Sequence, residues 1–106
     1  MDLNKMAGSL GLDIEDVKEL LDLFVETTRV DLEELKEALA VKDAARIHSK
    51  THSIKGASGN LGLSDFYKLA KKADDLARDG VLDGLELLVD DFADKFYLFA
   101  GEIADL

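Results

Sequence analysis

A long stretch with apolar residues at every third or fourth position limits the fold of this chain more than any other feature. The stretch begins after Asp13 and runs to about Ala40, and the sequence contains no proline. This spacing is typical of an α-helix that buries one face, and such a helix spans roughly 40 Å at 1.5 Å per residue. The predicted buried face consists of Ile14, Val17, Leu21, Phe24, Thr28, Leu32, Leu35 and Leu39.

The same spacing, together with capping residues, predicts four further helices. One short helix precedes the long one, and three follow it after short connections, which favour antiparallel neighbours. We therefore expect an all-α protein: an antiparallel up-down four-helix bundle over residues 13–106 with a short extra N-terminal helix, residues 2–11, as a lid. The predicted starts are Asp2, Asp13, Asp43, Ser64 and a capping box over Asp83 to Glu86, and the predicted stops are Gly11, Gly62 and Gly80.

Length and composition favour a single cytoplasmic domain. The chain has 106 residues, and its N-terminus lacks the basic and apolar segments of a signal peptide. A net charge of −10 repels phosphate backbones and anionic lipids. We therefore expect neither nucleic acid nor a membrane as a partner, and we also expect a monomer. The lack of cysteine excludes disulfides and thiolate metal sites.

The charge is unevenly distributed along the chain. Between Lys42 and Asp79 there are 8 basic and 5 acidic residues, whereas the rest of the chain has 5 basic and 18 acidic residues. No Asp or Glu occurs from Ala44 to Ser64, although 23 of the 106 residues are acidic. The local field of this segment suits a small anionic group or an acidic pocket on a partner.

The acid-free segment contains two histidines one helical turn apart. When residues are placed at 100° intervals, His48, His52, Lys55 and Gly59 lie to one side of the buried face, so we expect solvent to reach His52. Gly56 and Gly59 each cost about 1 kcal/mol of helix stability relative to alanine. Either room is needed beside the imidazole, or a neighbouring helix packs closely there.

The following helix has a matching polar flank. Tyr67, Lys71, Asp74 and Arg78 are displaced from its apolar face in the same rotational sense. Antiparallel packing makes the two flanks either converge or diverge. If they converge, Asp74 can accept a hydrogen bond from one ring nitrogen of His52, which would fix the tautomer and leave the other nitrogen as a nucleophile.

The residues around His52 resemble a known family. His52, Lys55, Gly56, Leu61 and Gly62 match the pattern H-x-x-K-G-x-x-x-x-L-G of the histidine-containing phosphotransfer (Hpt) domains of two-component phosphorelays. The resemblance covers residues 20–103, and the motif is far more specific than a histidine and a lysine alone. It implies a four-helix bundle that displays one phosphorylated histidine.

The resemblance also implies a role for each matching residue. His52 would accept the phosphoryl group on Nε2 and exchange it with the aspartate of a receiver domain, Lys55 would contact that group, and Gly56 would leave space for the partner. Asp74 falls where the family often has a Gln or Glu that orients the imidazole. The implied partners are a response-regulator receiver domain and/or a histidine kinase, with Mg²⁺ on the receiver and no cofactor in this chain.

Two positions depart from the family pattern. Thr51 precedes the histidine where the family commonly has alanine, and Asp74 is shorter than Gln or Glu. If Asp74 falls short of His52, water or a backbone group would have to hold the ring.

The charge pattern agrees with phosphoryl transfer, which depends mainly on alignment and on neutralising charge on the moving oxygens. A phosphoryl group gains charge-assisted hydrogen bonds from Lys55, and from Lys71 or Arg78 if these reach it, whereas a neighbouring carboxylate repels it. The segment has neither a carboxylate cluster for Mg²⁺ nor a glycine-rich nucleotide loop. We therefore expect a phosphoryl carrier with no kinase activity of its own.

Two other classes of function are considered. His48 and His52 have a spacing that can bind zinc, with Asp74 as a third ligand, but no fourth ligand is evident and Lys55 would repel the ion, so we expect no metal site. A purely structural bundle is the second alternative, and it predicts that His52→Gln changes nothing. The candidate partner-binding residues are His48, Gly56, Gly59, Lys71 and Arg78; ordinary flanking or solvated positions are the alternative for His48, Lys71 and Arg78.

Overall fold

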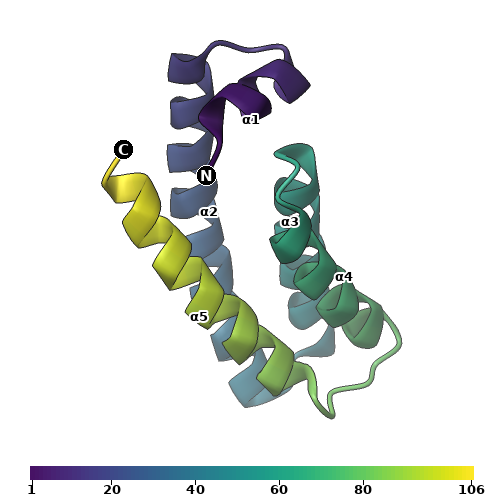
Figure 1. The fold of residues 1–106 in the computed structure, drawn as a ribbon. Coiled ribbons are helices and arrows are strands. Elements are labelled where there is room, and N and C mark those ends of the chain that lie inside the picture. The colour runs from purple at the N-terminus through teal and green to yellow at the C-terminus, as the bar shows by residue number, and fades with distance from the viewer.

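The computed structural model describes residues 1–106 and contains five α-helices and no strand. The predicted all-α class is therefore confirmed. None of the helices is both long and apolar enough to cross a membrane. The helices are α1 (Leu3–Leu10), α2 (Ile14–Val41), α3 (Ala44–Asn60), α4 (Ser64–Arg78) and α5 (Leu85–Ala104) (Figure 1).

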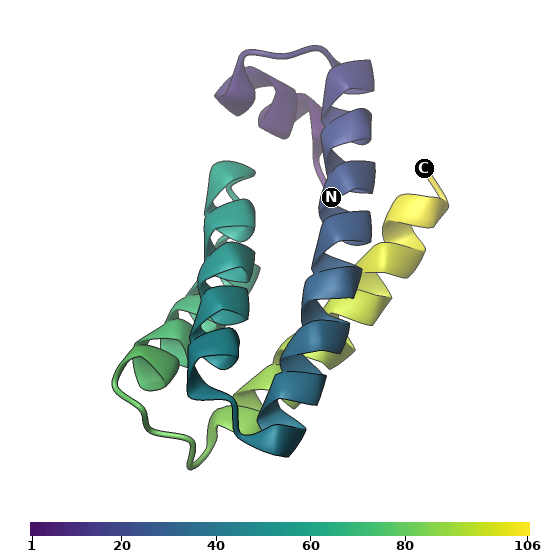
Figure 2. The ribbon, with the colours of Figure 1, turned by 180° about the vertical axis from the view of Figure 1, so that it is seen from behind.

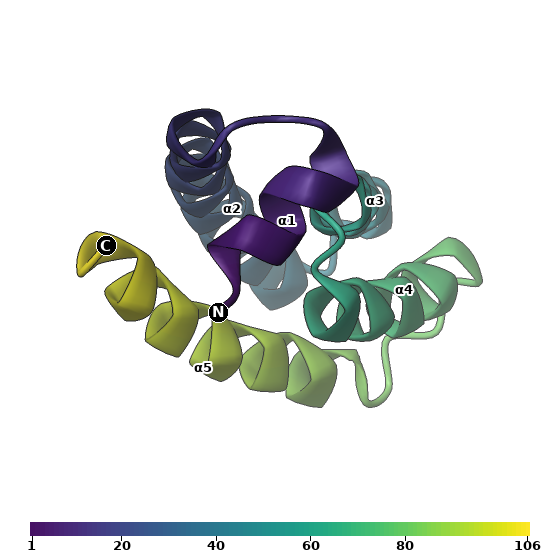
Figure 3. The same ribbon diagram turned by 45° about the horizontal axis from the view of Figure 1, so that its top comes forward.

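The four longer helices enclose one apolar core. α2 and α4 each pack against both α3 and α5, so every one of these helices has two neighbours. Figures 1 and 2 show α2 and α3 side by side, whereas α5 crosses α2 obliquely. α1 packs against α2 and lies across the end of the molecule where α3 turns into α4 (Figure 3).

The aromatic part of the core joins three of the helices and leaves out the fourth. Five phenylalanines from α2, α4 and α5 pack with ring centroids between 5.1 and 6.4 Å apart. By contrast, the buried residues of α3 are two isoleucines and two hydroxyl residues. α3 therefore contacts the core through aliphatic and hydroxyl side chains and contributes no aromatic ring. The phenylalanines are Phe24, Phe66, Phe92, Phe96 and Phe99.

Three of the predicted caps are confirmed. Asp2, Asp13 and Asp43 each accept a hydrogen bond from the backbone N–H three residues later, at 3.0, 2.8 and 3.1 Å. Such bonds satisfy one of the free N–H groups at a helix start. The Asp43 cap matters most here, because it fixes where α3 begins.

Two predicted helix caps are wrong. Ser64 does not cap α4, because the N–H of Leu63 bonds to the carbonyl of Ser58 at the end of α3 and the next helix begins at once. The capping box over Asp83 to Glu86 is not formed either. Gly84, in the left-handed conformation at φ 77°, precedes α5 without any side-chain cap.

Candidate functional site

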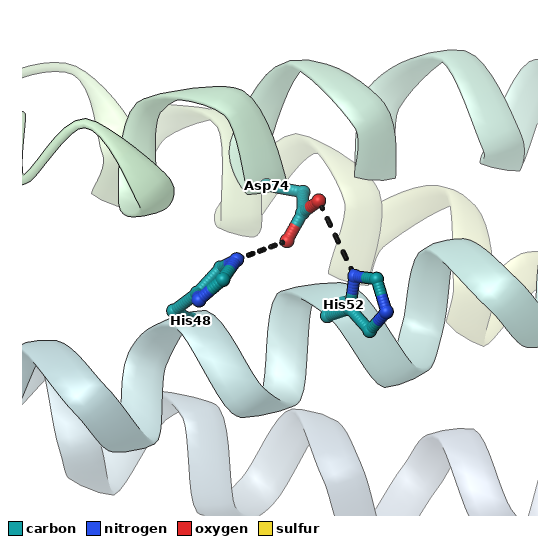
Figure 4. A group of neighbouring side chains, drawn as sticks. All are labelled: His48, His52 and Asp74. Atoms are coloured by element: carbon teal, nitrogen blue, oxygen red, sulfur yellow. Dashed lines mark ion pairs between the residues drawn. The ribbon is translucent and has the colours of Figure 1, made fainter.

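Asp74 is the only buried acidic residue of the chain, with 2% of its surface exposed. It lies on α4 and faces two histidines of α3 (Figure 4). Nε2 of His48 is 3.4 Å from Oδ1 of Asp74, and Nδ1 of His52 is 3.6 Å from Oδ2. The polar flanks of the two helices therefore converge, which is one of the two arrangements that the sequence allows.

Two other side chains, Lys55 and Thr51, form hydrogen bonds with the Asp74 carboxylate. Lys55 donates to Oδ2 at 2.9 Å, and the hydroxyl of Thr51 donates to Oδ1 at 3.1 Å. Burial by itself would raise the pKa of Asp74, but the bonds from Lys55 and Thr51 outweigh it and hold the pKa below its ordinary value of 3.8. The bond to Asp74 also raises the pKa of Lys55. At neutral pH the site therefore holds one carboxylate and one ammonium group.

His52 is open to solvent, as predicted, with 69% of its side chain exposed. Figure 4 shows one ring nitrogen turned toward Asp74 and the other on the far side of the ring. The separation of 3.6 Å is longer than a hydrogen bond, which is typically about 2.7 to 3.2 Å. Oδ2 of Asp74, the oxygen that faces His52, already accepts a hydrogen bond from Lys55. Asp74 thus faces the imidazole as a nearby charge in this conformation.

His48, His52 and Asp74 are also the residues that could hold a metal ion. Their ligand atoms all lie within 4.8 Å of one another. The set supplies three ligands, whereas structural zinc sites usually have four. A metal ion bound to the Asp74 carboxylate would also lie next to the positively charged Lys55 or would have to displace it, because Lys55 bonds to that carboxylate. The surroundings of Asp74 therefore suit protonated donors better than a metal.

The two glycines after His52 have different surroundings. A Cβ at Gly59 would lie 3.1 Å from the ring of Tyr67, so close packing between α3 and α4 accounts for this glycine. A Cβ at Gly56 would meet nothing within 4 Å. Packing within the chain therefore does not explain Gly56, which leaves open space one turn after His52.

The two basic residues predicted on the flank of α4 are paired away from His52. Lys71 bonds to Asp75 at 3.0 Å, and Arg78 lies 3.4 Å from the other oxygen of the same carboxylate. Both side chains are exposed. Lys55 is therefore the one basic side chain bonded at the carboxylate that faces His52.

Thr51 is not among the predicted site residues, and Asp74 was predicted on a flank displaced from the apolar face of its helix. Both residues are buried and bonded to each other. A usable signal was present, because Thr51 lies on the predicted apolar face of its helix and a buried hydroxyl needs a polar partner. Asp74 follows Ala73 directly, so a slightly wider buried face of α4 includes it.

A shallow depression of about 190 Å³ lies between α2 and α3, on the same stretch of α3 that follows Gly56. Five of its seven lining residues are hydrophobic, and Leu23 among them is well exposed. The depression combines residues from two helices, so the sequence did not predict it. It is lined by Leu20, Leu23, Phe24, Thr27, Ala57, Asn60 and Leu61.

Comparisons with known proteins agree with this geometry. The family model of the Hpt domain matches residues 19–106. The crystal structure of histidine-containing phosphotransfer protein B (HptB) from Pseudomonas aeruginosa PAO1 is similar over 100% of this chain and 96% of that chain, with a TM-score of 0.82 and 27% sequence identity. Among curated proteins, none matches the sequence.

Proposed function

The chain belongs to the Hpt domain family, and we propose that it carries a phosphoryl group on His52 and exchanges it with the aspartate of a receiver domain. Hpt proteins are phosphoryl carriers that interact with response-regulator receivers and histidine kinases in phosphorelays. The family match and the likeness to HptB support a histidine phosphotransfer role in phosphorelays. In this proposal α2 to α5 form the four-helix bundle that displays His52, with α1 as an additional helix.

The observation that carries the proposal is the orientation of His52. Its ring is exposed, and Nδ1 faces an ionised carboxylate. A carboxylate on one side of an imidazole favours the proton on that nitrogen and leaves a lone pair on the other. Nε2 is then an accessible nucleophile.

In the proposed reaction, the lone pair of His52 Nε2 attacks the phosphorus of the receiver's aspartyl phosphate. An N–P bond forms while the P–O bond to the receiver carboxylate breaks, and that carboxylate leaves with the electron pair. Because Nδ1 keeps its proton, the imidazole becomes positively charged. Asp74 stabilises this charge from 3.6 Å away. The reverse reaction follows the same path, and the partners decide its direction.

We further propose that this chain supplies no metal and no kinase activity, and that Mg²⁺ belongs to the receiver. The acidic pocket that would hold the ion needs several oxygen ligands. Around His52 the only carboxylate within contact distance is Asp74, and it is bonded to Lys55 and Thr51.

Lys55 is positioned to move from Asp74 to the phosphoryl group. It lies on α3 one turn after His52, with 24% of its side chain exposed. A phosphoryl group with about two negative charges competes with the carboxylate for this ammonium group. We expect Lys55→Ala to slow phosphotransfer by roughly tenfold to a hundredfold, measured with a phosphorylated receiver, and to leave the helical circular dichroism spectrum unchanged.

Lys95→Ala is the matched control for this variant, because it removes the same charge from α5, which does not pack against α3. Its transfer rate should equal that of the wild type. Equal rates for Lys55→Ala and Lys95→Ala would contradict the role of Lys55.

We propose that the partner docks on the face around His52, with the space at Gly56 and the depression between α2 and α3 inside the contact area. Gly56→Gln adds a side chain to open space in a helix, so it should stabilise the fold by about 0.5 to 1 kcal/mol while weakening productive docking. We expect a higher receiver concentration at half-maximal rate and a higher midpoint of thermal unfolding.

Gly101→Gln on α5 is the control, because this helical glycine is also exposed and also has nothing within 4 Å. It should give the same gain in stability with unchanged transfer. A Gly56→Gln variant that transfers as well as Gly101→Gln would exclude Gly56 from the contact area.

The proposed function is tested by incubating the chain with a receiver domain phosphorylated by a small-molecule donor and by following the label. The wild type should gain a phosphate that is labile in acid and stable in alkali, as expected of phosphohistidine. A chain that takes up no label from any of several receivers, and from a histidine kinase core with ATP, would refute the proposal.

A further inference from the structure

The two oxygens of the Asp74 carboxylate face different residues. Oδ2 is bonded to Lys55 and faces His52, which are the residues that the proposed function uses. Oδ1 accepts a hydrogen bond from the hydroxyl group of Thr51, with 3.1 Å between the two oxygens, and it lies 3.4 Å from Nε2 of His48. The proposed reaction assigns no role to this second pair.

The hydroxyl of Thr51 has few alternatives to this bond. Only 2% of the residue is exposed, and the single other acceptor within reach is the carbonyl oxygen of His48, also at 3.1 Å. Thr51 also borders a small cavity of about 10 Å³ in which all nine other lining residues are hydrophobic. An ionised carboxylate only accepts hydrogen bonds and is a stronger acceptor than a neutral carbonyl. Asp74 is therefore the main partner of this hydroxyl.

A carboxylate without such a bond would not keep its orientation. The last torsion of an aspartate side chain joins an sp³ to an sp² carbon and has broad, nearly two-fold preferences. Lys55 alone could follow either oxygen, because its long side chain is flexible and partly exposed. A donor in the rigid core that holds Oδ1 fixes the plane of the carboxylate and thereby the direction of Oδ2.

We infer that Thr51, assisted by His48, is a positioning residue for phosphotransfer, which holds Oδ1 of Asp74 so that Oδ2 faces Lys55 and Nδ1 of His52. This inference rests on the proposed function of His52. Thr51 acts through Asp74 and does not touch the transferred group. Its hydroxyl is the part that matters, and its methyl group only fills the core.

The experiment compares Thr51→Val with Thr51→Ser. Valine keeps the shape of threonine and removes the hydroxyl, whereas serine keeps the hydroxyl and removes the methyl group. Nitrogen-15 NMR of the unphosphorylated protein measures which ring nitrogen of His52 carries the proton, and label transfer from a receiver measures the rate. Thr51→Val should lower the share of His52 protonated on Nδ1 and slow transfer about tenfold, and Thr51→Ser should stay within about twofold of the wild type.

Thr51→Ala, which removes both groups, serves as the second variant without a hydroxyl and should resemble Thr51→Val in the NMR and rate measurements. A Thr51→Val protein with the tautomer and rate of the wild type would overturn the inference, as would a Thr51→Ser protein impaired as strongly as Thr51→Ala. The NMR readout needs no partner. A wild type that accepts no phosphate therefore refutes the proposed function, whereas unchanged His52 tautomers in the variants refute only the role of Thr51.

Discussion

Replacing His52 with glutamine is expected to abolish the uptake of acid-labile phosphate from a phosphorylated receiver. The amide of glutamine has no nucleophilic nitrogen, because its lone pair is delocalised into the carbonyl group. The fold should persist, since the side chain is 69% exposed and glutamine is a good helix former. Label transfer followed by acid and alkali treatment measures the effect, and circular dichroism verifies the fold.

His48→Gln provides the comparison for this variant, because His48 is the only other imidazole of the chain and lies one turn earlier on α3. It should still take up acid-labile phosphate, at a reduced rate, because Oδ1 of Asp74 loses a neighbouring group. The two variants would exchange their behaviour if His48 were the acceptor. Uptake by both would indicate an acceptor other than histidine and refute the assignment.

Asp74→Asn should slow phosphotransfer by roughly tenfold or more. Asparagine has nearly the same shape but no charge, so it cannot stabilise the positive charge that forms on the His52 ring. Its amide group also places a donor opposite one of the two donors, Lys55 or Thr51, that now bond to the carboxylate. The rate of label transfer at saturating receiver measures this effect. An Asn variant as fast as the wild type would show that the charge of Asp74 is not used.

The same variant gives a prediction for stability against pH. The pKa of Asp74 is lowered in the folded chain, so the carboxylate stabilises the fold above its unfolded pKa, and this stabilisation disappears as the pH falls through the folded value. The difference in unfolding free energy between wild type and Asp74→Asn should therefore be constant near neutral pH and shrink below about pH 4. Urea titrations at several pH values measure it. A difference that grows with acid would contradict the lowered pKa.

The helices of this chain could be predicted from the sequence because their signals are local. Apolar spacing and the three aspartate caps depend only on residues within one or two turns, and the structure agrees with both. The predicted caps at Ser64 and Asp83 are not formed, for a different reason. There the backbone is set by the end of the previous helix or by a left-handed glycine, and the capping residue is displaced by one position.

Only part of the geometry of the candidate site was predictable from the sequence. Placing residues around a helix axis correctly predicted that solvent reaches His52, and it gave Asp74 as a neighbour on α4 only if the two polar flanks converge. It could not decide whether the polar flanks of the two helices converge, how deeply Asp74 is buried, or which oxygen of its carboxylate faces which donor. Those properties depend on how closely α3 and α4 pack, which the spacing of residues along one helix does not give. The same limit applies to the glycines, since only the position of Tyr67 separates Gly59 from Gly56.

The bond between Thr51 and Asp74 also has a consequence for how these two positions can be substituted. These are also the two positions at which the chain departs from the pattern that the sequence resemblance implies, which is alanine before the histidine and Gln or Glu on the next helix. Lengthening Asp74 alone would push its carboxylate against Thr51, and shortening Thr51 alone would free Oδ1. Contacting residues of this kind show coupled effects of about 0.5 to 3 kcal/mol. We therefore expect substitutions at Thr51 and Asp74 to have coupled effects, which a double-mutant cycle would measure.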